Sequence, residues 1–82
     1  MIKVRAEFYS SLKEIVDASA FELSLPENAT VNDLLEQLQQ HFPKLRAFAK
    51  SILCGIGVEF VDRNHQLKEG DTVAIMPPVQ GG

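Results

Sequence analysis

Apolar and charged residues alternate at the start of the chain. The apolar positions are Ile2, Val4, Ala6 and Phe8, and Lys3, Arg5 and Glu7 stand between them. Because successive side chains of a strand point to opposite faces, this period of two predicts a half-buried strand. The alternation returns in residues 21–25 and stops at Pro26, which predicts a second strand.

A short helical pattern lies between these two strands. Residues 10–17 carry apolar side chains at helical spacing. Ser11 and Glu14 stand three residues apart, as in a capping box, in which each residue satisfies a free backbone amide of the other. We therefore expect one or two helical turns here.

The clearest element is a longer helix that begins near residue 30. Thr30 can cap the helix, and Asp33 follows three residues later. The apolar residues that share one face are Val31, Leu34, Leu35, Leu38 and Phe42. Pro43 should end the helix, because the residue before a proline is disfavoured in the helical conformation.

The second half of the chain is predicted to return to strands. Residues 45–52 have looser apolar spacing and should form a short helical or irregular stretch. A turn is expected over residues 68–71, followed by a last strand over residues 72–76 that runs directly into two prolines.

An apolar segment over residues 53–61 is interrupted by glycines. Ile56, Val58 and Phe60 alternate within it, as in a strand, and Gly55 and Gly57 stand between them. A glycine inside a strand usually marks a bulge or a close approach of another backbone. We therefore expect one of these features at Gly55 or Gly57.

The element order predicts an α+β fold. Two strands, one main helix packed across them and further strands match a ubiquitin-like β-grasp with a mixed sheet of four to five strands. In that fold the last strand lies beside the first, inside the sheet. Residues 1–76 should form the domain, and residues 77–82 an extended tail displayed by its most firmly held strand.

Composition and charge narrow the function classes. The 82 residues are 45% hydrophobic and 23% charged, as in a soluble globular domain, and the net charge is −3. Nucleic-acid binding needs clustered Lys and Arg, so we expect no nucleic-acid partner. No run of apolar residues is long enough to cross a bilayer, so we expect no membrane partner either. The lone Cys54 excludes an internal disulfide and fits a reducing cytoplasm, which is the expected location.

Catalytic and metal-ligand patterns are missing from the sequence. His41 and His65 are not spaced to share a metal with a cysteine or carboxylate, so no metal is expected. Cys54 could relay sulfur, but its apolar neighbours favour a buried, inert thiol.

The remaining candidate is the carboxyl group of Gly82. Gly81 and Gly82 have no Cβ, so this tip could enter a narrow slot, and Pro77 and Pro78 favour an extended path towards it. A carboxylate is a poor electrophile, and forming a mixed anhydride with a nucleotide would activate it. The alternative is a frayed chain end without a function.

Residues 70–82 resemble one family closely. They follow the pattern Gly-Asp-x-Val-Ala-x-x-Pro-Pro-Val-x-Gly-Gly, which is similar to the end of the MoaD-type small subunit of molybdopterin synthase, a ubiquitin-like sulfur carrier of the MoaD/ThiS family. Gly57 departs from the family, in which many members carry Asn or another polar residue near this position. Three alternatives stay open: a sulfur carrier for thiamine or tRNA, a ubiquitin-like modifier joined to proteins through Gly82, and an inert binding module.

The resemblance implies a reaction sequence and partners. A MoeB-type, E1-like enzyme would use ATP to adenylate Gly82, and sulfur would replace AMP to give a thiocarboxylate. The tail would enter a MoaE-type large subunit, in a heterotetramer of two small and two large subunits, and donate sulfur to cyclic pyranopterin monophosphate. The chain itself would bind no cofactor and would be a non-catalytic donor subunit.

The resemblance also assigns roles to individual residues. Gly82 would carry the reacting group. The tail residues that would bind the partner are Pro77, Pro78, Val79, Gln80 and Gly81, with Val79 as an apolar anchor. Tyr9 and Met76 are candidates for a docking patch, and packing into the core is an equally good interpretation of both.

Overall fold

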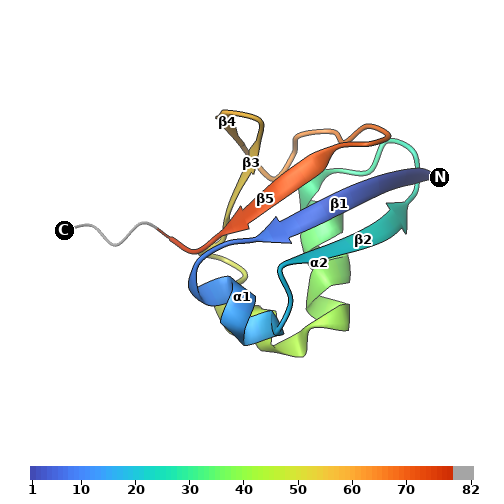
Figure 1. Ribbon diagram of the computed structural model, residues 1–82. Coiled ribbons are helices and arrows are strands. Elements are labelled where there is room, and N and C mark those ends of the chain that lie inside the picture. The colour runs from blue at the N-terminus through green and yellow to red at the C-terminus, as the bar shows by residue number, and fades with distance from the viewer. Residues whose placement is uncertain (79–82) are drawn as a thin grey trace.

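The computed structural model describes residues 1–78, and in them one five-stranded sheet is combined with three helical segments (Figure 1). The strands are β1 (Ile2–Phe8), β2 (Ala20–Leu25), β3 (Leu53–Ile56), β4 (Glu59–Val61) and β5 (Thr72–Met76). The helical segments are α1 (Ser11–Val16), α2 (Val31–His41) and the 3₁₀ helix η1 (Pro43–Phe48). The predicted order of strands and main helix is confirmed.

The sheet is mixed, with the strand order β2-β1-β5-β3-β4. β1 and β5 run parallel, and the other neighbours run antiparallel. The last strand therefore lies beside the first, as predicted, and it is flanked on its other side by β3. Figure 1 shows β5 crossing the middle of the sheet.

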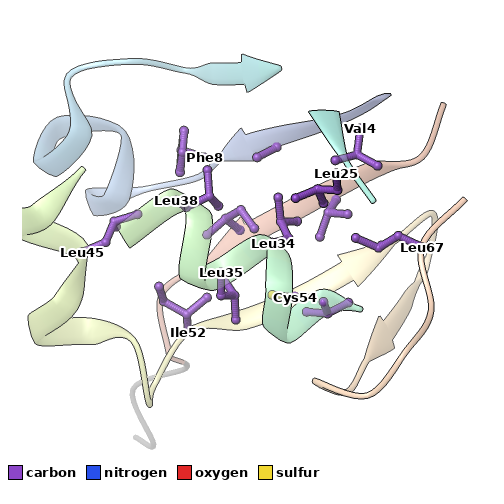
Figure 2. Close-up of a cluster of buried hydrophobic side chains, with 14 of the residues drawn as sticks. Val4, Phe8, Leu25, Leu34, Leu35, Leu38, Leu45, Ile52, Cys54 and Leu67 are labelled. Atoms are coloured by element: carbon purple, nitrogen blue, oxygen red, sulfur yellow. The ribbon is translucent and has the colours of Figure 1, made fainter. Parts of the chain in front are cut away.

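The core lies between α2 and one face of the sheet (Figure 2). The side chains of β1 alternate between the two faces of the sheet, as the sequence predicts. Val4, Ala6 and Phe8 are buried on the core face, and Lys3 and Arg5 are exposed on the other. The buried side of α2 consists of Val31, Leu34, Leu35 and Leu38. Burial of these side chains is the main force that holds the helix on the sheet.

Hydrogen bonds at the start of α2 confirm the predicted cap. The backbone amide of Asp33 donates to the Thr30 hydroxyl (3.3 Å), and the Thr30 amide donates to the Asp33 carboxylate (2.9 Å). The next two free amides, those of Val31 and Asn32, donate to the carbonyl oxygens of His65 and Arg63. The loop before β5 thus completes the cap, and the helix ends before Pro43, as predicted.

The predicted cap of α1 is wrong, although the helix itself forms. The N-cap residue is Ser10, its φ is 56°, and no side chain caps this helix end. Asp17 ends the helix in the left-handed conformation. The helix is held instead by burial of Leu12 and Val16, so tertiary packing replaces the local hydrogen bonds that Ser11 and Glu14 suggested.

Residues 53–61 form a hairpin of β3 and β4, so the strand-like alternation of Ile56, Val58 and Phe60 does not continue through Gly57. Gly57 lies in the turn with φ +64°, where a side chain would be strained. This turn reverses the chain, so Phe60 pairs with Gly55 on the face of the sheet opposite to Ile56. The predicted close approach is confirmed at Gly55, where an added Cβ would lie 3.1 Å from the carbonyl oxygen of Glu59.

We predict that Thr30→Ala lowers the free energy of unfolding by about 1 kcal/mol, because it removes the cap of α2. Urea unfolding of the two proteins measures this difference. Ser11→Ala is the matched control, since no side chain caps α1, and it should change stability by less than about 0.5 kcal/mol. Equal losses in both variants would contradict the assignment of the caps.

Candidate functional site

The end of β5 is held on both sides. Met76 pairs with Leu53 of β3, and the backbone amide of Tyr9 donates to the carbonyl oxygen of Ile75 (3.0 Å). Pro77 and Pro78 follow directly and are half-buried outside the strand. The four predicted tail residues Val79, Gln80, Gly81 and Gly82 lie outside the described residues.

A hollow opens on the face of the sheet opposite to α2, beside the end of β5. It has a volume of about 290 Å³. The residues that line it are Tyr9, Gly55, Gly57, Val58, Glu59, Phe60, Ala74 and Met76. Phe60 is 70% exposed and Tyr9 is 46% exposed. Large apolar side chains in water are characteristic of a surface that another molecule covers, and we call this surface the docking hollow.

The shape of the docking hollow follows from small residues in the middle of the sheet. Phe60, Gly55 and Ala74 stand side by side on three neighbouring strands. Gly55 has no side chain, and an added Cβ would lie 3.3 Å from the terminal methyl group of Met76. The surrounding side chains of Phe60 and Met76 therefore form walls around a floor of backbone.

Charged side chains cover the other half of this sheet face. Arg5 donates to the carboxylates of Glu7 (3.1 Å) and Glu22 (3.4 Å), which raises the pKa of its guanidinium. The Tyr9 hydroxyl donates to Glu7 at 3.5 Å, at the boundary between the two halves. The open face thus combines an apolar region next to the tail with a charged region over β1 and β2.

The two predicted docking residues, Tyr9 and Met76, come together at this hollow. Gly55, Val58, Phe60 and Ala74 were not predicted as part of a site. Their alternation in the sequence predicts a strand for Val58 and Phe60. In the structure the chain reverses at Gly57, and both side chains are exposed to solvent. Apolar residues on both sides of a glycine that can form a turn were the available signal.

Cys54 is buried, as predicted. Burial raises the pKa of its thiol to about 11, although the charge of Arg63 partly opposes this shift. Among residues 1–78, no three His, Cys, Asp or Glu side chains come close enough to hold a metal ion. His41 lies 4.7 Å from the ring of Phe21, measured between ring centres.

No helix within residues 1–78 combines the length and the apolar character that crossing a bilayer requires.

The fold defines the chain as a ubiquitin-like β-grasp protein. Similar structures include a putative molybdopterin converting factor subunit 1 from Pyrococcus furiosus, with TM-score 0.86, 24% identity, and coverage of 96% of this chain and 100% of the other. SAMP1 from Haloferax volcanii, named a small archaeal modifier protein in a second structure, has TM-score 0.84 and 25% identity over 98% and 99% of the two chains. These structures confirm the predicted fold.

The chain belongs to the ThiS family, whose sequence profile matches residues 6–82. The molybdopterin synthase sulfur carrier subunit of Mycobacterium tuberculosis is 32% identical over 100% of both chains. A similar chain from Helicobacter pylori (22% identity, TM-score 0.70, 99% of this chain and 100% of that chain) was solved as a complex of subunits 1 and 2 of molybdopterin-converting factor. The resemblance inferred from the tail is confirmed.

Titration of Cys54 should make stability depend on pH. Because its pKa in the folded chain, about 11, exceeds the ordinary value of 9.0, the unfolded chain loses this proton first as pH rises. Stability is therefore retained below pH 9 and decreases towards pH 11. Urea unfolding should show wild type losing stability relative to Cys54→Ala between pH about 8 and about 10.5, whereas a constant difference would contradict the burial of the thiol.

Proposed function

We propose that this chain is the sulfur-carrier subunit of a molybdopterin synthase and acts through the carboxyl group of Gly82. The observation that carries this proposal is the similarity over full length to relatives named for this activity. The position of the last strand supports it as well. The central strand β5 ends at Met76, next to the apolar docking hollow, and the sequence continues with Pro77 and Pro78 towards Gly82.

The first step is activation of Gly82. Its carboxylate is ionised at neutral pH and must be converted into a better electrophile. A MoeB-type, E1-like enzyme transfers AMP from ATP to the carboxylate and releases pyrophosphate. A sulfur nucleophile at the oxidation level of sulfide then displaces AMP, which leaves a thiocarboxylate. ATP belongs to the activating enzyme, and the chain needs no cofactor of its own.

The second step is transfer of sulfur. The thiocarboxylate sulfur attacks an oxygen-bearing carbon of cyclic pyranopterin monophosphate, and as the C–S bond forms, the C–O bond of that carbon breaks and its oxygen leaves with the bonding electron pair and takes up a proton. The sulfur stays attached to Gly82 as a thioester link. Water then cleaves the link between the glycyl carbonyl and sulfur, which leaves sulfur on the pterin and restores the carboxylate. The absence of Cβ atoms in Gly81 and Gly82 keeps the tip narrow, and Pro77 and Pro78 reduce the entropy lost on insertion.

The docking hollow is the proposed contact for a MoaE-type large subunit, in a heterotetramer of two small and two large subunits. Tyr9, Phe60 and Met76 offer apolar area next to the origin of the tail. Contact at this surface would place the tail at the entrance of the partner's pocket. The complex of the Helicobacter pylori relative supports a two-subunit arrangement.

A second candidate is a ubiquitin-like modifier joined to lysines of other proteins through Gly82. The similarity to SAMP1 favours this alternative. Both functions begin with adenylation of the same carboxyl group, so the acceptor distinguishes them. Carriers for thiamine or tRNA share this activation, and the names of the full-length relatives favour the pterin route over them.

The mass of the chain purified from its own cells tests the proposal. We predict a fraction whose mass has increased by the replacement of one oxygen atom by sulfur, and no such fraction after deletion of Gly82. Because the last strand ends at Met76, the deletion should leave the free energy of unfolding unchanged within about 0.5 kcal/mol. A series of higher-mass protein conjugates without any thiocarboxylate would favour the modifier.

Phe60→Ala should weaken binding of the large subunit about tenfold, because it removes an aromatic wall of the docking hollow. Since Phe60 is 70% exposed, the stability of the isolated chain should change by less than about 0.5 kcal/mol. Calorimetric titration measures the affinity. Glu22→Ala, in the charged half of the same face, is the control, and an equal loss there would contradict docking at the hollow.

A further inference from the structure

Positive charge is concentrated in one part of this acidic chain. Residues 37–58 contain no Asp or Glu but include Lys44, Arg46 and Lys50. This stretch therefore carries +3, while the remaining residues, with all 11 acids and five of the 8 basic residues, carry −6. We call residues 44–50 the basic segment.

The fold exposes the charges of the basic segment. Leu45 is fully buried and fixes η1 to the core, whereas Lys44, Arg46 and Lys50 are exposed. Within residues 1–78, the ion pairs formed by lysine and arginine side chains involve Arg5 alone. The three positive charges thus face solvent without a carboxylate partner in the described structure, although α1, which packs against η1, carries Glu14 and is followed by Asp17.

Arg63 holds the end of this segment in a defined shape. Its Nη2 atom donates to the carbonyl oxygens of Ala49 and Ile52, each at 2.9 Å. The Ser51 amide donates to the carbonyl oxygen of Phe48 (2.8 Å), which closes the turn around Lys50. A surface held in this way loses little conformational entropy when it binds.

Favourable charges at helix ends explain only part of the pattern. Arg46 lies in the last turn of η1, where a positive charge interacts favourably with the helix dipole. Lys44 lies in the first turn of η1, and Lys50 lies beyond its end. Helix stability does not account for these two lysines.

The basic segment lies at the end of the domain from which the tail leaves. Leu53 pairs with Met76, so the beginning of β3 stands next to the end of β5. Lys50 precedes Leu53 by three residues, a span of at most about 10 Å. Lys3 and Lys68 lie at the other end of β5, where the Gly70 amide bonds to the carbonyl oxygen of Lys3 (2.8 Å).

We propose that the basic segment is a second contact surface, which binds an acidic area beside the slot of the large subunit and steers the domain towards it with the tail end first. This inference rests on the proposed function. The separation of +3 and −6 within one small domain creates the electrostatic asymmetry that such orientation needs. Complementary charge acts mainly on the rate of association.

A protein surface fits these charges better than RNA does. Binding to nucleic acid relies on many phosphate contacts and a domain with an excess of positive charge. Here only three exposed basic side chains gather, and the net charge of the chain is −3. A small cationic area on an acidic domain suits a local acidic area on a protein.

Two double variants with equal changes in net charge test the proposal. Lys44→Gln with Lys50→Gln alters the basic segment, and Lys3→Gln with Lys68→Gln is the matched control at the other end of the domain. The probe is the purified MoaE-type large subunit from the same organism, and stopped-flow mixing gives the association and dissociation rates. We expect about fivefold slower association for the first variant at low salt, an unchanged dissociation rate, and no difference at about 1 M salt.

The other outcomes separate the two proposals. Equal slowing in both variants, or no slowing in either, would overturn the basic segment as a contact while leaving the proposed function intact. Absence of binding between wild type and the large subunit at every salt concentration would overturn the proposed function itself. Tight binding of RNA that only the first variant loses, with unchanged association to the large subunit, would assign the segment to RNA instead.

Discussion

The parallel pairing of β1 with β5 is the constraint on which the rest of the structure depends. It joins the first and last strands of the chain, from Arg5 opposite Thr72 to Phe8 opposite Ile75. Because β3 binds the other side of β5, the strand that precedes the tail has neighbours on both sides. In the proposed function the tail enters a slot of the partner. A strand with neighbours on both sides is a firmer origin for such a tail than a strand at the sheet edge, which is hydrogen-bonded on one side only.

Pairing on both sides of β5 places the two proposed contact surfaces near the end of this strand. Tyr9 follows β1 and bonds to Ile75, while the hairpin of β3 and β4 brings Phe60 to the neighbouring side of Met76. The basic segment leads into β3 and reaches the same end. In the proposed function, the apolar surface would provide affinity and the charged one orientation, and the domain would guide a carboxyl group that a partner enzyme activates.

Local signals in the sequence predicted the main elements of the fold but only part of the site, namely Tyr9 and Met76. Thr30, Asp33 and Pro43 act within a few residues of their own position, so the bounds of α2 could be predicted. The cap at Ser11 failed because packing of Leu12 and Val16 decides the geometry there. The exposed position of Phe60 depends on a turn at Gly57 and on pairing with Gly55, which alternation along a single strand does not reveal.

A single-turnover reaction tests whether Gly82 delivers sulfur to the pterin. The chain, prepared with a thiocarboxylate at Gly82, is mixed with the large subunit and cyclic pyranopterin monophosphate, and both the mass of the chain and the sulfur content of the pterin are followed. Each sulfur lost from Gly82 should appear in the pterin as the carboxylate is restored. A thiocarboxylate that survives in the assembled complex without any sulfur in the pterin would contradict this role of Gly82.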